Sequence, residues 1–184
     1  TRLLQALRED ATGLRALNVT CEAYSAATPY AVWRELLREF MEIRRDDPDA
    51  VVVDCLRREV TARAPDLAPW LPLIGMAFGV EIAPTPEVEM LAERNRRSKL
   101  HEAVGRFLEV MMPDPVFIEI ENAHHMDVAS AALLSFVAGL CGARPWLVGV
   151  ARRPSDSGFT APQVSSVVRI ELEPLSPDDA LRFT

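Results

Sequence analysis

The hydrophobic positions change their spacing along the chain, and these changes divide it into expected strands and helices. Short apolar runs rich in β-branched residues predict buried strands, whereas apolar residues three and four apart predict amphipathic helices. The expected strands cover residues 17–21, 116–120, 146–150 and 167–172. The expected helices begin at the N-terminus, after Pro29, near 49–63 and 87–111, after the capping Asp127, and after Ser176. The proline-rich segment 64–86 is expected to be irregular with short turns.

Strands that alternate with helices predict an α/β fold, a parallel sheet with helices on both faces. Ligands of such sheets bind beyond the carboxyl ends of the strands. In this chain those ends fall at Cys21, Glu121, Ala151 and Leu172. Polar residues that follow these positions are therefore the first candidates for a functional site.

Composition narrows the class of protein without identifying it. The chain has 184 residues, of which 49% are hydrophobic and 26% charged, as expected for one domain with a sizeable core. A net charge of −7 disfavours nucleic-acid binding by this segment. No apolar run approaches the ~20 residues of a membrane span. Three widely spaced cysteines suggest buried reduced thiols, so we expect a cytoplasmic location.

The most informative segment is the strand 116–120 with the polar residues that follow it. A buried apolar strand delivers Glu121 and then Asn122 at its carboxyl end. A nucleoside triphosphatase needs this arrangement, because the acid holds the Mg²⁺ shell and the next group orients the attacking water. A strand that merely ends in a polar turn explains the same spacing, since such ends are common in doubly wound folds.

Four stretches, in the same order along the chain, resemble the AAA-type (STAND) signalling ATPases, which are P-loop NTPases. Such domains occur in large bacterial LuxR-type transcription regulators and multidomain class III nucleotide cyclases. The matching stretches are 21–30, with Cys21-Glu22-Ala23-Tyr24 and Thr28-Pro29-Tyr30, then 121–127, 146–154 and 172–180. The second of these, Glu121-Asn122-Ala123-His124-His125-Met126-Asp127, resembles the Walker B region.

The resemblance implies where the nucleotide would bind. The phosphate loop of this family ends in Gly-Lys-Ser/Thr followed by Arg-Leu-Leu, and the chain starts with Thr1-Arg2-Leu3-Leu4. The family pattern thus assigns Thr1 and Glu121 to Mg²⁺, and Thr1, Arg2 and Arg152 to ATP, with Arg152 as a sensor of the γ-phosphate. It also implies one P-loop NTPase core over 1–184, truncated at both ends, without its first strand and phosphate loop, and with a helical insertion at about 47–112.

Two residues depart from the family pattern. Asn122 replaces the second acid, and an amide can hydrogen-bond a water but cannot accept its proton. General-base assistance is typically worth roughly 10²- to 10⁴-fold in rate, so we expect slow hydrolysis. His125 replaces the usual tryptophan, a change that concerns packing below the strand end.

Other clusters allow alternative interpretations. His124, His125 and Asp127 could suggest a metal site, but structural packing is favoured because no third His or Cys is spaced to help. The arginines at 94, 96 and 97 could supply an intersubunit finger, although a solvated helix face explains them better.

The sequence therefore predicts a regulatory module that binds Mg-ATP and switches an output domain of the same full-length chain. By family analogy that domain binds DNA or cyclises nucleotides, and homo-oligomers are possible. This segment itself is expected to touch neither nucleic acid nor membrane. A working ATPase that resets the switch, and a degenerate scaffold that binds no nucleotide, remain the alternatives.

Overall fold

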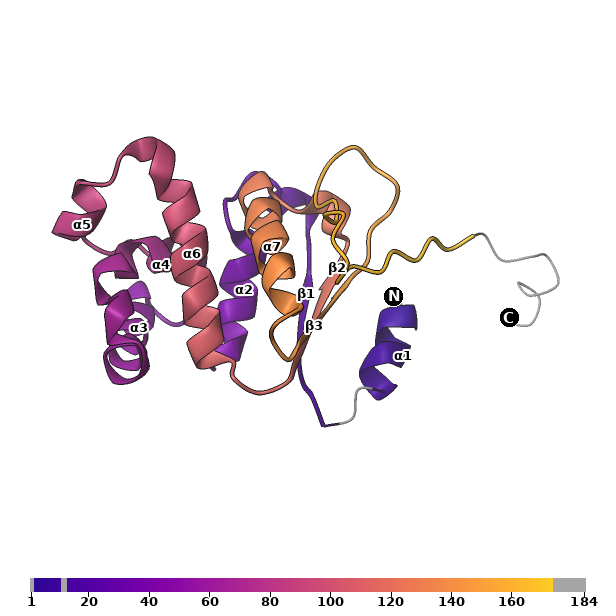
Figure 1. The fold of residues 1–184 in the computed structure, drawn as a ribbon, viewed down its shortest axis with the longest axis horizontal. Helices are drawn as coiled ribbons and strands as arrows, with labels where there is room; N and C mark the ends of the chain where they lie inside the picture. The colour runs from indigo at the N-terminus through magenta and orange to yellow at the C-terminus, as the bar shows by residue number, and fades with distance from the viewer. Residues whose placement is uncertain (1, 11–12, 174–184) are drawn as a thin grey trace.

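Three parallel strands form the centre of the molecule (Figure 1). The computed structural model describes residues 2–10 and 13–173. Its strands pair in the order β1-β2-β3, with Arg15 opposite Val116 and Val116 opposite Trp146. They are β1 (Arg15–Thr20), β2 (Val116–Glu121) and β3 (Trp146–Val150). Three of the four expected strands are thus confirmed, and β2 is the middle one.

Helices cover the two faces of this sheet. Figure 1 shows the sheet nearly edge-on, with α2 (Ala31–Phe40) and α7 (Val128–Cys141) on one side and α1 (Arg2–Asp10) on the other. β2 is buried on both faces except at its last residue, which explains its nearly continuous apolar sequence. The α/β fold class expected from the sequence is therefore confirmed.

The middle of the chain forms a helical layer that packs beyond α2. The helix expected at 49–63 is confirmed as α3, and the Phe78 and Phe107 rings from α4 and α6 meet edge to face at 5.7 Å. No helix in the described part of the chain is both long and apolar enough to cross a membrane. The elements of this layer are α3 (Asp49–Arg63), η2 (Pro65–Trp70), α4 (Leu71–Phe78), α5 (Pro86–Glu89) and α6 (Glu93–Met111).

The short turns expected within the irregular segment 64–86 are present as η2, but the segment also contains a helix, α4, that was not expected. Pro72 lies in the first turn of α4, where a helix does not need the missing N–H. Gly79 ends the helix in the left-handed conformation. Because α4 is buried on nearly every side, its apolar residues show no amphipathic spacing from which to recognise a helix.

The single helix expected at 87–111 is also wrong, because the structure divides it into α5 and α6. The Thr85 hydroxyl accepts a hydrogen bond from the Val88 N–H at 3.3 Å and caps α5. Ala92, in an extended conformation, then precedes a new helix. Val88 is buried in α5 whereas Met90 is 80% exposed, so no single apolar stripe continues through the break.

The strand expected at 167–172 is absent, because this segment joins no sheet among the described residues. A strand requires a neighbour that takes up its N–H and C=O groups. Val168, Ile170 and Leu172 are 84%, 63% and 72% exposed, as expected for an unpaired segment. The helix expected after Ser176 lies outside the described residues.

A buried carboxylate joins the N-termini of α2 and α7. Asp127 is 5% exposed, and its Oδ1 accepts hydrogen bonds from the Ser130 N–H at 2.8 Å and the Tyr30 N–H at 3.1 Å. The expected cap of α7 is confirmed, and the same oxygen also serves the start of α2. Both helix dipoles favour negative charge at this point. Burial, and then the Asp127 charge, raise the pKa of the nearby Cys21 to about 12, so this thiol stays protonated.

Replacing Asp127 should therefore release two helix N-termini together. We expect Asp127→Ala to lower the free energy of unfolding by about 2–3 kcal/mol, because a cap and a second buried N–H lose their acceptor. Asp127→Asn keeps Oδ1 and should cost clearly less. Asp47→Ala, at a half-buried carboxylate that accepts the Arg44 N–H, is the control and should cost under about 1 kcal/mol. Equal losses for Asp127→Ala and Asp47→Ala in urea unfolding would contradict the assignment.

Candidate functional site

The polar pair expected at the end of β2 lies at the carboxyl edge of the sheet. Glu121 is the last strand residue and is half-buried, and its backbone oxygen accepts the Cys21 N–H at 2.9 Å. Asn122 follows in the left-handed conformation, with φ of 54°, and opens the short turn η3 (Ala123–His125). Asparagine is one of the few residues that adopt this conformation readily. The identity of residue 122 therefore has a backbone reason besides any chemical role.

The end of β3 brings Arg152 to the same place. The Ala151 N–H donates to the Ile120 oxygen and the Ala123 N–H donates to the Ala151 oxygen, both at 2.9 Å. These two bonds continue the pairing past the strand ends and place the Arg152 backbone beside Glu121 and Asn122. The structure thus brings together the three predicted site residues whose side chains it describes.

The Arg152 guanidinium, however, is turned into its own loop. It donates to the Thr160 hydroxyl at 2.9 Å and to the Ser157 oxygen at 3.4 Å, and also to the backbone oxygens of Ser155 and Phe159. In this conformation Arg152 organises the loop at residues 152–160. Its contact with a γ-phosphate remains a prediction and would require some of these bonds to exchange.

The 152–160 loop packs closely against η3. The Phe159 side chain is buried, and its N–H donates to the Ala123 oxygen at 2.9 Å. The Ser157 hydroxyl donates to the His124 oxygen at 3.0 Å. Gly158, between them, has φ of 77°, and a Cβ there would lie 2.6 Å from the His124 Cα. Only glycine allows this approach, so the loop and the turn after β2 form one unit.

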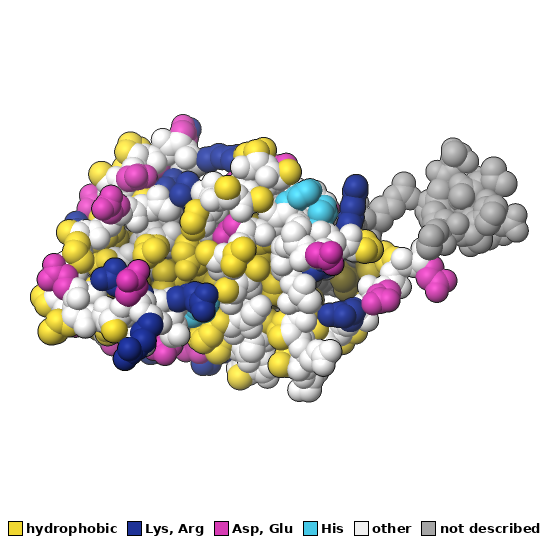
Figure 2. Space-filling model, turned by 90° about the horizontal axis from the view of Figure 1, so that it is seen from above, with side chains coloured by type: hydrophobic (Ala, Val, Ile, Leu, Met, Phe, Trp, Pro, Cys, Tyr) yellow, Lys and Arg dark blue, Asp and Glu magenta, His cyan; other side chains and the backbone are white. Residues whose placement is uncertain are grey.

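The two histidines of η3 lie at the edge of this unit. Their rings are 4.1 Å apart, and the Arg153 N–H donates to His124 Nδ1 at 3.4 Å. Desolvation, followed by the charges of His125 and the two arginines, lowers the pKa of His124, which keeps Nδ1 available as an acceptor at neutral pH. Figure 2 views the molecule from this end and shows histidine side chains at the surface beside basic ones.

The metal interpretation of this cluster finds no geometric support. The Asp127 carboxylate faces the N-termini of α2 and α7, where it accepts two backbone hydrogen bonds. Within residues 2–10 and 13–173, no three His, Cys, Asp or Glu side chains are grouped as a metal centre would require.

The remaining predicted residues are not placed at the site by the structure. Thr1 lies outside the described residues, and Arg2 belongs to α1 without a described side chain. The arginines at 94, 96 and 97 are exposed at the start of α6, and nothing in the structure tests their role as a finger.

Sequence reasoning missed one acid at this sheet. Glu119 lies in the middle of β2 and is 3% exposed, and its Oε2 is 3.8 Å from Arg8 Nη1 of α1. The sequence alone contains an indication of this role, because a charged residue inside an otherwise apolar strand is rare unless it has a partner. The partner could not be read from the sequence.

These features define a class of protein. A parallel sheet with helices on both faces, and with polar groups gathered at its carboxyl edge, is an α/β domain whose ligands bind at that edge, and it is consistent with a P-loop NTPase-like fold. The chain belongs to the family described as AAA ATPase domain, whose family model matches residues 1–148. Neither a curated protein nor a solved structure matches it in the corresponding comparisons. The AAA-type assignment made from the motifs is thereby confirmed, while the regulator or cyclase context is not addressed by this match.

The close fit of Gly158 gives a direct test of the joint between loop and turn. We expect Gly158→Ala to lower the free energy of unfolding by about 2 kcal/mol, because a left-handed alanine is strained and its Cβ meets backbone. Hydrogen exchange in the 152–160 loop should also become faster.

The matched control is Gly139→Ala. Gly139 is a helical glycine of α7 whose added Cβ meets nothing within 4 Å. This change should raise stability by about 0.5–1 kcal/mol. If both variants lost stability, or if neither did, the close contact at Gly158 would not be what holds the 152–160 loop against η3.

Proposed function

We propose that this domain binds Mg-ATP at the carboxyl edge of the sheet and acts as a regulatory switch whose hydrolysis is slow. The observation that carries the proposal is the placement of Glu121 and Asn122 at the end of the middle strand, beside the Arg152 backbone, in an AAA ATPase domain. AAA ATPase domains generally bind ATP with Mg²⁺. The attached output domain and a single core over 1–184, with its helical insertion at about 47–112, belong to the same proposal.

The residues present suit Mg²⁺ better than a structural metal. Mg²⁺ keeps several waters and uses one or two protein oxygens together with the phosphates. The half-buried Glu121 at the strand end matches that demand, with the Thr1 hydroxyl proposed as the second protein ligand. No larger group of ligands is needed, in keeping with its absence among the described residues.

An open sheet edge supports the P-loop arrangement. β3 pairs with β2 on one side and with no described residue on the other. We place the first strand of the family pattern along this edge, where its carboxyl end would bring the phosphate loop to Glu121. The segment 167–172, with its exposed apolar side chains, would then have a strand to pair with.

Binding is tested by calorimetry on the full-length protein with Mg-ATP. We expect micromolar affinity and a loss of roughly tenfold or more on Glu121→Ala, since a charged ligand to the cation is removed. The loss should largely disappear when Mg²⁺ is omitted. Glu81→Ala, at an exposed acid after α4 in the helical layer, is the control and should bind like the wild type. A folded protein without ATP binding would favour the scaffold alternative.

Hydrolysis is tested by Asn122→Asp. We expect the turnover of ATP to rise by roughly 10- to 100-fold, because the carboxylate can accept a proton from the attacking water. Aspartate also tolerates the left-handed conformation, so the turn should be preserved. Asn122→Gly keeps the backbone but supplies no side chain and should not increase turnover. No increase with Asn122→Asp in an ATP-binding protein would refute the role assigned to this position.

A further inference from the structure

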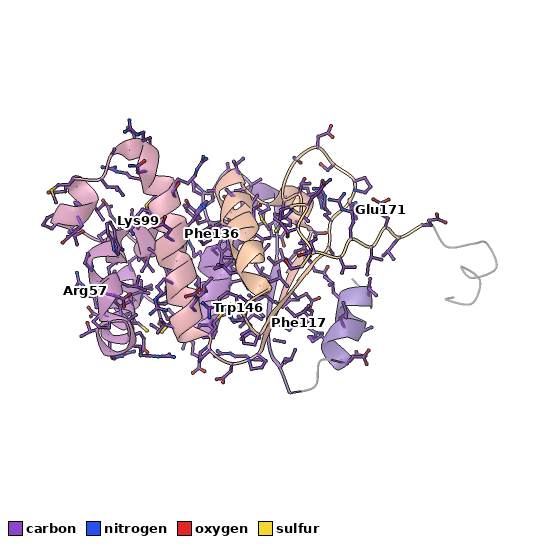
Figure 3. All side chains as sticks on the ribbon, viewed as in Figure 1. Arg57, Lys99, Phe117, Phe136, Trp146 and Glu171 are labelled. Atoms are coloured by element: carbon purple, nitrogen blue, oxygen red, sulfur yellow. The ribbon has the colours of Figure 1, made fainter. Side chains whose placement is uncertain are left out.

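α1 is held on the sheet by few side chains. Of residues 3–10, only Leu4 is buried; the others are exposed. Leu4 enters a notch over β3 that exists because Gly149 has no side chain: a Cβ there would lie 2.8 Å from Leu4 Cδ2 and 3.1 Å from the Phe117 ring. Figure 3 labels Phe117 on the α1 side of the sheet and Trp146 on the side of α7. One apolar contact alone is a weak anchor for a nine-residue helix.

Glu119 provides the second contact. Its side chain is 4% exposed, and its Oε2 has no hydrogen-bond partner. Asn18 and Gly149 lie opposite it in the register, and the charge that reaches it is Arg8 Nη1 at 3.8 Å. Because the Arg8 side chain is 46% exposed, the arginine can return to water, whereas the glutamate cannot. A carboxylate buried in this way depends strongly on the cation that pairs with it, which among the described residues is Arg8.

Position along β2 connects this pair to the candidate site. Side chains two residues apart in a strand point to the same face, so Glu119 and Glu121 both face the α1 side. Figure 1 shows that α1 runs opposite to the strands, so that its first turn points toward the edge where they end. Any shift of α1 along the sheet therefore changes the distance between its first turn and Glu121.

We propose that Glu119 is a positioning residue: through Arg8 it fixes α1 against β2 and so sets where the first turn of α1 lies relative to Glu121. The part of this proposal that concerns nucleotide rests on the proposed function. The part that concerns α1 does not.

The test is hydrogen exchange of the α1 amides in the full-length protein without nucleotide. Glu119→Gln and Arg8→Met should each speed exchange in α1 by roughly three- to tenfold relative to β2. The double variant should show no more than the larger single effect, because both changes break the same pair. Arg8→Lys should keep most of the protection.

Global stability separates this role from general damage. Glu119→Gln removes a buried charge and should leave the free energy of unfolding in urea unchanged or raise it. Arg8→Met leaves the Glu119 carboxylate buried without its cation and should lower the free energy of unfolding. Arg45→Met, in the exposed pair with Glu35 at 3.0 Å, is the matched control and should change neither readout. Unchanged α1 exchange in Glu119→Gln, or additive effects in the double variant, would overturn the proposal.

A second readout, Mg-ATP affinity, tests the link to the site. If the wild type binds Mg-ATP, Glu119→Gln should lower the affinity for Mg-ATP several-fold, whereas Arg8→Lys should leave this affinity unchanged. Unchanged affinity with a loosened α1 would overturn the positioning role. If the wild type binds no ATP, the proposed function fails, and the exchange experiment still decides whether Glu119 holds α1.

Discussion

The pairing of β2 with a neighbour on each side is the constraint on which the rest of the structure depends. Buried on both faces and hydrogen-bonded along both edges, β2 can tolerate few changes of side chain or register. Its carboxyl end is consequently the best-fixed point at which polar groups can be presented. Glu121 and Asn122 occupy that point, and a ligand site built there inherits the rigidity of the core.

The surroundings of this strand end are fixed largely by contacts that involve backbone groups. The bonds of Ala123 and Ala151 extend the β2–β3 pairing, Asp127 joins the starts of α2 and α7, and Gly158 lets the 152–160 loop reach η3. Each of these contacts links segments distant in sequence. A movement of β3, α2 or the loop would therefore be expected to reach the turn after β2, as the proposed regulatory role requires.

The elements predicted correctly from the sequence are those that depend on interactions between residues close together in the chain. The elements that were missed depend on tertiary contacts. Periodicity and capping identified β2, α3 and the Asp127 cap, because such signals lie within a few residues. α4 was missed because a helix buried on nearly all sides has no polar face. At the site, the positions of Glu121 and Asn122 followed from the strand pattern. The orientation of the Arg152 guanidinium depends on acceptors up to eight residues away, and no spacing rule encodes it.

Glu119 and Glu121 show how depth in a sheet separates two chemically identical side chains. Both lie on the same face of β2, about 6.6 Å apart along the strand. Glu119 is enclosed between the strands and α1, where a charged carboxylate requires a nearby cation. Its ion pair with Arg8 meets this requirement. Glu121 is half-buried at the carboxyl edge, where the proposed Mg²⁺ would bind. The same strand thus carries one acid suited to hold a helix and one suited to meet a ligand, and a movement of α1 is felt by both.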